Sequence, residues 1–541
     1  MKLQFGILVF FFLTSAIGEF AFAGSFEDEP IPLRREGAGQ YDRLILRGGY
    51  IIDGKGAPPT GPADIVIEKD RITEIRQVGT PGVAIDPAHR PAAGDREIDI
   101  SGQFVLPGFI NTHTHLHAGP WPQKVPLEYM FKLWLAHGIT TIRTVGYSGE
   151  DFAIRLKHLS EQNKITAPRL SVYPVFGAGS GRGSIQDGIT TVKQARQRVK
   201  ALKKKGADGI KFLGAPEAIL WAALEEAKAQ GLPSTMHHEQ LAVSYANVVH
   251  TSAKGLNGME HWYGLPEAMF EHQRVQDYPT DYLYNNEQDR FGQAGRLWKQ
   301  AAPPFSDKWH QVMNHLIDHD FALSPTMVVY LASRDVMRMM RAEWHDQYTL
   351  PSLWNHFRPS RTSHAAYWYD WTTEDEVEWK NNYSLWMTFL NAYKNRGGTV
   401  TVGTDAGYGY VTYGFAYIQE MELLQEAGFH PLEVIHSATE AAAKLIGRDA
   451  DIGVVEVGKK ADLVIVSENP INNLKVLYGT GAIKLNDTTG HLERIGGVRW
   501  TIKDGVVYDA KQLLKEVKKM VRVNKIENQI DPDLPMPILQ D

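Results

Sequence analysis

The chain has 541 residues, a formal net charge of -6 and 43% apolar residues. This apolar fraction is enough for a large folded core and argues against disorder. The mild acidity and the lack of a long basic run give no sign of a nucleic-acid partner, and the absence of cysteine excludes disulfides, thiolate metal sites and thiol nucleophiles.

The N-terminus has the pattern of a secretory signal peptide over residues 1–23. Lys2 supplies a short basic region, Phe5 to Ile17 is apolar, and Ala21-Phe22-Ala23 forms a small-x-small cleavage site. An uncleaved membrane anchor is the alternative, but the apolar run is shorter than the roughly 20 residues that span a bilayer. We therefore expect a secreted or periplasmic protein with no stable membrane anchor after cleavage. Residues 24–42 are polar and contain prolines, which predicts a loose leader.

Both ends of the mature chain predict β-structure. Residues 43–106 contain a strand, turn and strand over Leu44–Gly54, then a hairpin around Lys69-Asp70. Residues 450–524 contain a buried strand and a hairpin across Asp504-Gly505. Two β-rich ends that flank one long middle segment favour a single discontinuous β-domain.

The middle, residues 107–449, alternates short apolar runs with helical patterns, as expected for a βα-repeat. Pro431 to Leu445 is predicted to be one amphipathic helix. About 340 residues is ample for an eight-stranded barrel, for which about 250 is typical. The excess falls at about residues 262–395, which hold nine of the thirteen tryptophans. Extra packing helices and an aromatic lid over the substrate are both compatible with this segment, and residues 525–541 are predicted to be a proline-bearing tail.

The first chemical signal is a pair of histidines after an apolar run. His113 and His115 are spaced i, i+2, so on a strand both imidazoles lie on one face. Two neutral imidazoles on one face form half of a divalent metal site. His117 continues the spacing one step further, and we expect a substrate contact there rather than a ligand. Three tyrosines that follow or end predicted strands are candidates for the pocket wall, with simple packing as the alternative: Tyr147, Tyr330 and Tyr408.

Further ligand-type residues end later strands, where the active sites of such barrels lie. Lys211 is followed after 26 residues by His237 and after a further 24 by His261, and Asp405 ends a late apolar run. Taken singly, each has an ordinary explanation, such as a salt-bridged lysine, a hydrogen-bonded core histidine or a helix N-cap. Their order along successive strands favours a shared metal site, for which zinc is the default ion.

As a set, these segments resemble the amidohydrolase superfamily of metal-dependent hydrolases. The resemblance runs from about Leu44 to Tyr508 and looks most like the branch of imidazolonepropionase-like enzymes and metal-dependent Xaa-Pro or Xaa-Arg dipeptidases. The segments that carry it are Pro107–His115, Gly206–Lys211, Met236-His237, Met259–His261, Gly403–Gly407, Ala438–Ala443 and Ile452–Leu463.

The resemblance implies an α/β fold, a distorted (β/α)8 TIM barrel with a composite β-sandwich domain formed by both chain ends. It implies two divalent metal ions, with His113, His115 and Asp405 as ligands of the first and His237 and His261 as ligands of the second. Lys211, carboxylated by carbon dioxide, would bridge the two ions, and Asp405 would also be the catalytic proton carrier.

The implied activity is hydrolysis of an amide or peptide bond in a small molecule, such as a dipeptide or an N-acyl amino acid. A cyclic-amide, lactone or ester hydrolase, or a deaminase, is the alternative on the same barrel. A non-catalytic binding protein would be expected to have lost a ligand, and none is lost in this sequence. Such barrels often associate, so a homo-oligomer stays open.

Overall fold

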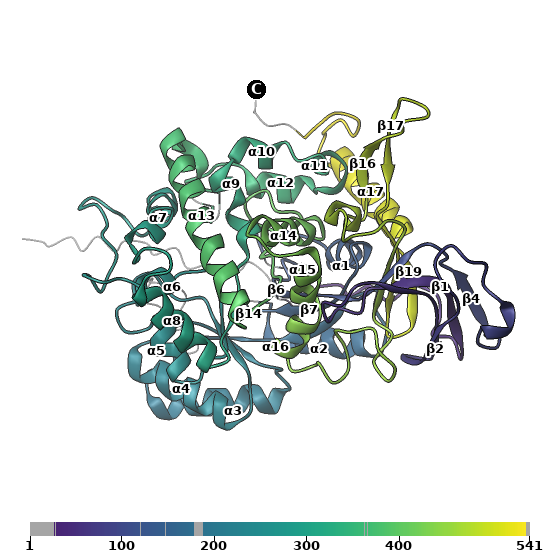
Figure 1. The fold of residues 1–541 in the computed structure, drawn as a ribbon. Helices are drawn as coiled ribbons and strands as arrows, with labels where there is room; N and C mark the ends of the chain where they lie inside the picture. Colours follow the sequence, from purple (N-terminus) through teal and green to yellow (C-terminus); the bar gives the residue numbers. More distant parts are fainter. Residues whose placement is uncertain are drawn as a thin grey trace, which may run out of the picture.

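The computed structural model describes residue 26 and residues 29–119, 121–146, 148–177, 188–361, 363–364 and 366–536. The predicted signal peptide, Tyr147 and the last five residues of the predicted tail lie outside this description. Figure 1 shows parallel strands surrounded by helices, with a separate sheet at one side that combines purple and yellow segments. Among the described residues, every helix is too short or too polar to cross a bilayer.

Both ends of the chain build one eight-stranded sheet. Its order is β19-β18-β15-β5-β1-β2-β3, with β4 paired to β1. β15 runs antiparallel to β5, with Leu463 opposite Pro107, and thereby joins the C-terminal strands to the N-terminal ones. The strands are β1 (Leu44–Ile51), β2 (Thr60–Glu68), β3 (Arg71–Gln77), β4 (Arg96–Asp99), β5 (Phe104–Pro107), β15 (Leu463–Val466), β18 (Val498–Lys503) and β19 (Val506–Asp509). A smaller hairpin of β16 (Ala482–Leu485) and β17 (Leu492–Ile495) stands beside this sheet.

The hairpins predicted in this sheet are present. Asp504 and Gly505 have φ of 49° and 75°, the paired positive values of the turn that an Asp-Gly pair favours. The predicted turn inside Leu44–Gly54 is wrong, because β1 continues to Ile51 and its register with β2 shifts between Leu46 and Gly49. Such a bulge bends a strand without reversing it.

The segments at the edges of this sheet differ from the sequence prediction. Ala38, in the predicted loose leader, exchanges two hydrogen bonds of 2.9 Å with Val507 of β19. Residues 510–524 were expected to belong to the β-unit, but they form most of helix α17 (Ala510–Glu527). Leu513, Val517 and Val521 are buried on one side of this helix, whose apolar side packs against α1 (Leu127–Ala136). These apolar residues have helical spacing, so the segment forms a helix rather than continuing the β-structure that precedes it.

The middle of the chain forms two parallel sheets. One contains β6-β7-β8 and the other contains β9 to β14 in sequence order. The strands are β6 (Phe109–Thr114), β7 (Ile139–Thr144), β8 (Arg169–Val172), β9 (Val175–Gly177), β10 (Ile210–Gly214), β11 (Ser234–Met236), β12 (Gly258–Glu260), β13 (Ala322–Ser324) and β14 (Thr399–Val400). Helices that alternate with these strands are α1, α2 (Glu150–Glu161), α3 (Val192–Lys205), α4 (Glu217–Ala229), α5 (Val248–Ala253), α8 (Asp307–Asp318), α13 (Thr373–Asn395) and α14 (Phe415–Glu426). The βα-alternation predicted for this part is therefore present.

Residues 262–395 are not one insert, because β13 lies within them and pairs with both β12 and β14. The additional helices are α6 (Leu265–Ala268), α7 (Glu287–Ala294), α9 (Leu331–Arg334), α10 (Val336–Met340), α11 (His345–Tyr348) and α12 (Pro351–Phe357). Six tryptophans of this segment are fully buried, including Trp262, which packs against Trp379 and Trp386 at 6.0 and 5.8 Å between ring centroids. For these six, the structure favours packing over a lid.

The predicted helix from Pro431 to Leu445 is divided into α15 (Pro431–Ala438) and α16 (Glu440–Leu445). Thr439 lies between them with φ of -132° and ψ of -88°, and its hydroxyl donates to the carbonyl of Ile435 at 2.7 Å. This side-chain bond to the preceding turn accompanies the break.

Candidate metal centre

His113 lies in β6 and His115 follows its end, and their side chains point the same way, as their spacing predicts. The two Nε2 atoms are 3.2 Å apart. Both face Asp405, with distances to its Oδ1 of 3.4 Å from His113 and 3.0 Å from His115. Because three ligand-type atoms converge within hydrogen-bond range, this part of the site resembles one half of a coordination sphere.

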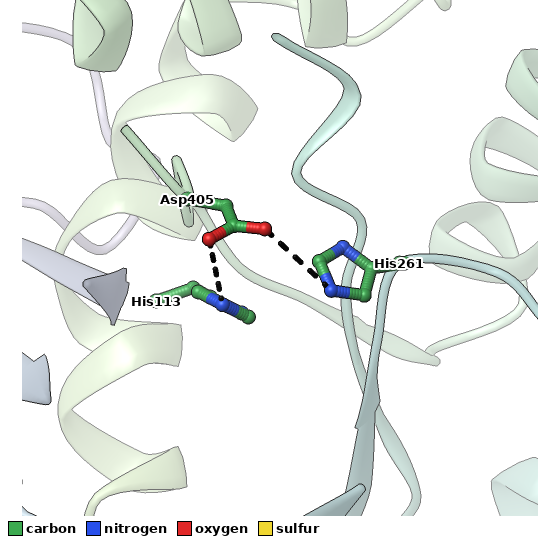
Figure 2. Close-up of side chains that lie close together, drawn as sticks. All are labelled: His113, His261 and Asp405. Atoms are coloured by element: carbon green, nitrogen blue, oxygen red, sulfur yellow. Dashed lines mark ion pairs between the residues drawn. The ribbon is translucent and has the colours of Figure 1, made fainter. Parts of the chain in front are cut away.

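Asp405 also faces His261, at 3.7 Å between Oδ2 and Nε2. Figure 2 shows this carboxylate between the two imidazoles, and the ligand atoms of His113, His261 and Asp405 all lie within 4.8 Å of one another. Asp405 and His261 have φ of 52° and 62°, a left-handed conformation that residues other than glycine rarely adopt. Backbone strain of this kind often accompanies functional sites.

His237 and Lys211 complete the predicted set. The ring of His237 is 4.8 Å from that of His261 between centroids. Lys211 was expected at the end of a strand, but it is the second residue of β10. Its buried Nζ lies 3.8 Å from Oε1 of Glu260 and makes no hydrogen bond within the described part of the chain. The six predicted ligand residues therefore gather in one region, although only part of the set is in mutual contact.

Glu260 was missed in the sequence and is fully buried at the centre of this network. Its carboxylate contacts Nδ1 of His113 and accepts from Thr235 at 2.6 Å and Arg143 at 2.9 Å. A glutamate inside an apolar strand is a usable signal, because a buried carboxylate must be paired.

Charges in the site suit neutral imidazole ligands. Burial lowers the pKa of His237 and His261 well below the ordinary value, so both rings are neutral at pH 7. Burial opposes ionisation of Asp405, but His113 and His115 outweigh it and hold the pKa of this carboxyl well below its usual range. Burial also lowers the pKa of Lys211 to about 8. These donors fit a divalent cation, and the buried Nδ1 of His115, like Lys211 Nζ, has no hydrogen-bond partner in the described residues.

The three predicted substrate contacts within the described residues, His117, Tyr330 and Tyr408, lie around this cluster. Nδ1 of His117 is 2.6 Å from the hydroxyl of Tyr413, and its ring packs against Trp121 and Tyr408. Gly407 makes this approach possible, because a Cβ at its φ of 107° would lie 2.4 Å from His117 Nδ1.

The ring of Tyr330 lies 5.8 Å from that of His261, but it also stacks on Trp379 at 5.5 Å. Tyr330 therefore contacts both the histidine cluster and the tryptophans packed behind it.

The chain is similar to known proteins in both sequence and structure. A family model described as "Amidohydrolase family" matches residues 104–272 and 384–507. The chain is 26% identical over 226 residues to a dihydroorotase from Anaeromyxobacter dehalogenans (strain 2CP-C), which covers 40% of this chain and 48% of that protein. The chain thus spans about half the length of the curated relatives it matches first.

Two solved structures share the fold over most of their length. A Xaa-Pro dipeptidase with bound methionine aligns with a TM-score of 0.56 at 19% identity, over 86% of this chain and 100% of that chain. A bottromycin amidohydrolase aligns with a TM-score of 0.60 at 18% identity, over 94% of this chain and 93% of that chain.

Proposed function

Because this chain belongs to the amidohydrolase family, we propose that it hydrolyses an amide or peptide bond in a small molecule, such as a dipeptide or an N-acyl amino acid. The observation that carries the proposal is the convergence of His113, His261 and Asp405 within 4.8 Å at the ends of parallel strands. The structural likeness to a Xaa-Pro dipeptidase is in keeping with a dipeptide substrate.

Two divalent ions, with zinc as the default, are proposed as cofactors. His113, His115 and Asp405 would hold one, and His237 and His261 the other, with Lys211 between them. A bound ion would supply an acidic water molecule and a polarised carbonyl. In carboxylation, the neutral amine of Lys211 would bond to the carbon of carbon dioxide and release one proton, and the ammonium form would first release another. The lack of a hydrogen-bond partner for Lys211 Nζ in the described chain supports this role.

Asp405 is proposed to move the proton during hydrolysis. Its carboxylate accepts a proton from the attacking water and returns it to the leaving nitrogen, so that the amine departs neutral. The surrounding network holds this carboxylate in place, because His113, His115 and His261 all approach its oxygens. His117, Trp121 and Tyr408 form an aromatic wall that would limit water near the reacting bond.

The complete architecture is also a proposal. The amide of Thr112 in β6 donates to the carbonyl of Val402, just after β14, at 3.0 Å. This bond supports closure of the two parallel sheets into a distorted (β/α)8 barrel over residues 107–449, completed by a composite β-sandwich from residues 43–106 and 450–524. Cleavage of residues 1–23, secretion or a periplasmic location, and self-association are proposed from the sequence alone.

The test is a mass-spectrometric screen of the zinc-loaded protein against dipeptides and N-acyl amino acids, with Asp405→Asn as the blank. Cleavage that disappears in the variant would support the proposal, and no cleavage across the library would contradict it. The second candidate is hydrolysis of a cyclic amide, lactone or ester, or deamination. The likeness to a dihydroorotase over 40% of the chain is the observation behind it, so such compounds belong in the same screen.

A further inference from the structure

A buried arginine is hydrogen-bonded to the segment that follows His237 and is not used by the chemistry above. Arg290 belongs to α7 and is only 5% exposed. Its guanidinium lies over the rings of Tyr284 and Phe291, with 5.1 Å from Cζ to each centroid. A buried cation among aromatic rings is costly unless an anion accompanies it.

The guanidinium is tied to the loop that follows one predicted ligand. Nε of Arg290 donates to Oε1 of Gln240 at 3.0 Å, and Gln240 lies three residues after His237. The ring of Tyr263 is 5.5 Å from that of His237, and Phe291, the residue after Arg290, packs against Tyr330 at 6.2 Å between ring centroids. Through Gln240 and this layer of aromatic side chains, Arg290 is connected to the His237 and His261 side of the centre.

The hydrogen-bonding capacity of Arg290 is largely unused. Within the described part of the chain, its only hydrogen bond is the one from Nε to Gln240. Its ion pair with Glu287 is loose, at 3.5 Å from Nη1, and Glu287 also pairs with His364 at 3.1 Å. Since guanidinium presents its donors as a planar fork that matches a carboxylate, the two Nη atoms are suited to bind a carboxylate in two-point fashion.

We infer that Arg290 binds a carboxylate of the substrate, so the substrates of this site are amides that carry a free carboxylate near the scissile bond. This inference rests on the proposed function and narrows it. A dipeptide or an N-acyl amino acid has the required group, whereas the corresponding carboxamides lack it. A role limited to pairing with Glu287 is the competing explanation, and it predicts no preference between such substrates.

The experiment compares N-acetyl amino acids with their carboxamides as paired substrates for the zinc-loaded enzyme. Arg290→Gln is expected to lower kcat/KM for the carboxylates by about a hundredfold, because a charge-assisted two-point contact is lost. The kcat/KM for the carboxamides should change by less than about threefold. For the carboxylates, the kcat/KM of Arg290→Lys should lie between those of the parent and of Arg290→Gln, because lysine keeps the charge but lacks the planar fork of donors.

Two further variants separate substrate binding from structure. Glu287→Gln removes the partner of Arg290 but not the guanidinium, so the preference for carboxylates should persist. Arg296 lies just after the same helix and pairs with Asp375 at 3.3 Å. In Arg296→Gln the preference for carboxylates should again persist. Loss of both substrate types to the same extent in Arg290→Gln and Glu287→Gln would overturn the inference.

Calorimetric titration of the same protein with N-acetyl-phenylalanine and its carboxamide, in both enantiomers, provides a readout that needs no turnover. The inference is supported if the parent binds the carboxylate more tightly than the carboxamide, and if Arg290→Gln loses this preference while its zinc content is unchanged. Equal binding or no binding of the two probes overturns it. Failure to cleave any amide would instead contradict the proposed function, while the binding preference still decides the role of Arg290.

Discussion

The carboxylate of Glu260 contacts Nδ1 of His113, although 147 residues separate them along the chain. Glu260 lies in β12 and His113 in β6, which belong to different parallel sheets, so the contact links the two sheets. With Nδ1 turned toward Glu260, Nε2 of His113 faces His115 and Asp405. A carboxylate behind a ligating histidine fixes its orientation and raises its basicity. Glu260 is therefore a positioning residue for the candidate metal centre.

We expect Glu260→Gln to weaken metal binding by about 10- to 100-fold. The neutral amide is a poorer acceptor for His113, and Arg143 loses its carboxylate partner. Metal retained after dialysis against a graded series of chelators measures the effect. Glu226→Gln is the matched control, because Glu226 of α4 is also buried but bonds to Gln230 and to Arg196 of α3. Equal metal retention by the two variants would show that Glu260 does not position a ligand.

Lys211 and Lys503 form a matched pair of buried lysines, and burial lowers the pKa of each to about 8. Lys503 donates to Ser160 O at 2.6 Å, whereas Lys211 makes no hydrogen bond in the described chain. Lys211→Met should therefore reduce bound metal from two ions per chain to one or fewer. Lys503→Met should keep both ions and lower the free energy of unfolding by about 1–3 kcal/mol.

Metal analysis with and without added bicarbonate measures this difference. Occupancy of the parent protein should rise with bicarbonate, and that of Lys211→Met should not. One ion per chain in the parent, unchanged by bicarbonate, would contradict both the bridging lysine and the second ion.

Asp405→Asn should lower kcat by about 10²- to 10⁴-fold, because the amide cannot accept and return a proton. The far-ultraviolet circular dichroism spectrum should stay unchanged, since the two side chains have the same shape. Asp307→Asn, at the exposed start of α8, makes the same chemical change away from the centre and should keep full activity. A kcat of Asp405→Asn within tenfold of the parent would remove Asp405 from the proton-transfer role.

Local patterns in the sequence predict the parts of the fold that depend on local rules. The i, i+2 spacing places His113 and His115 on one face, and the Asp504-Gly505 pair forms its hairpin turn. β13 is not recognisable, because three residues are too few to display a period. The break at Thr439 is equally hidden, since the apolar helical spacing continues through it.

For the candidate metal centre too, local sequence patterns predict only some of the residues. Lys211, His237 and His261 are recognisable because each accompanies a predicted strand. Glu260 and Arg290 act through contacts with residues far away in the chain, and one sequence does not state which distant strands and helices meet. The apolar strand around Glu260 indicates that its carboxylate is buried, but the partners of Glu260 and Arg290 become visible only with the packing around them.

Asp504 gives a pH-dependent prediction remote from the candidate metal centre. It pairs with Arg169 of β8 and with Lys460 at 2.9 Å, and so connects the terminal sheet to the parallel strands. Burial raises the pKa of this carboxyl, but Arg169, Lys503 and Lys460 outweigh it, so the folded pKa lies below the ordinary 3.8. The ionised group therefore stabilises the fold above about pH 4, and this contribution is lost as the pH falls through the folded pKa.

Asp504→Asn should accordingly lower the free energy of unfolding by about 3–5 kcal/mol at pH 7, because it leaves buried cations without their carboxylate. The difference from the parent should begin to shrink below about pH 4, because there the carboxyl takes up a proton in the unfolded chain while it stays ionised in the folded one. Urea unfolding followed by circular dichroism at pH 7, 5 and 3 measures it, with the exposed Asp487→Asn as control. A difference that is constant with pH would mean that Asp504 stabilises through shape and hydrogen bonding rather than through its charge.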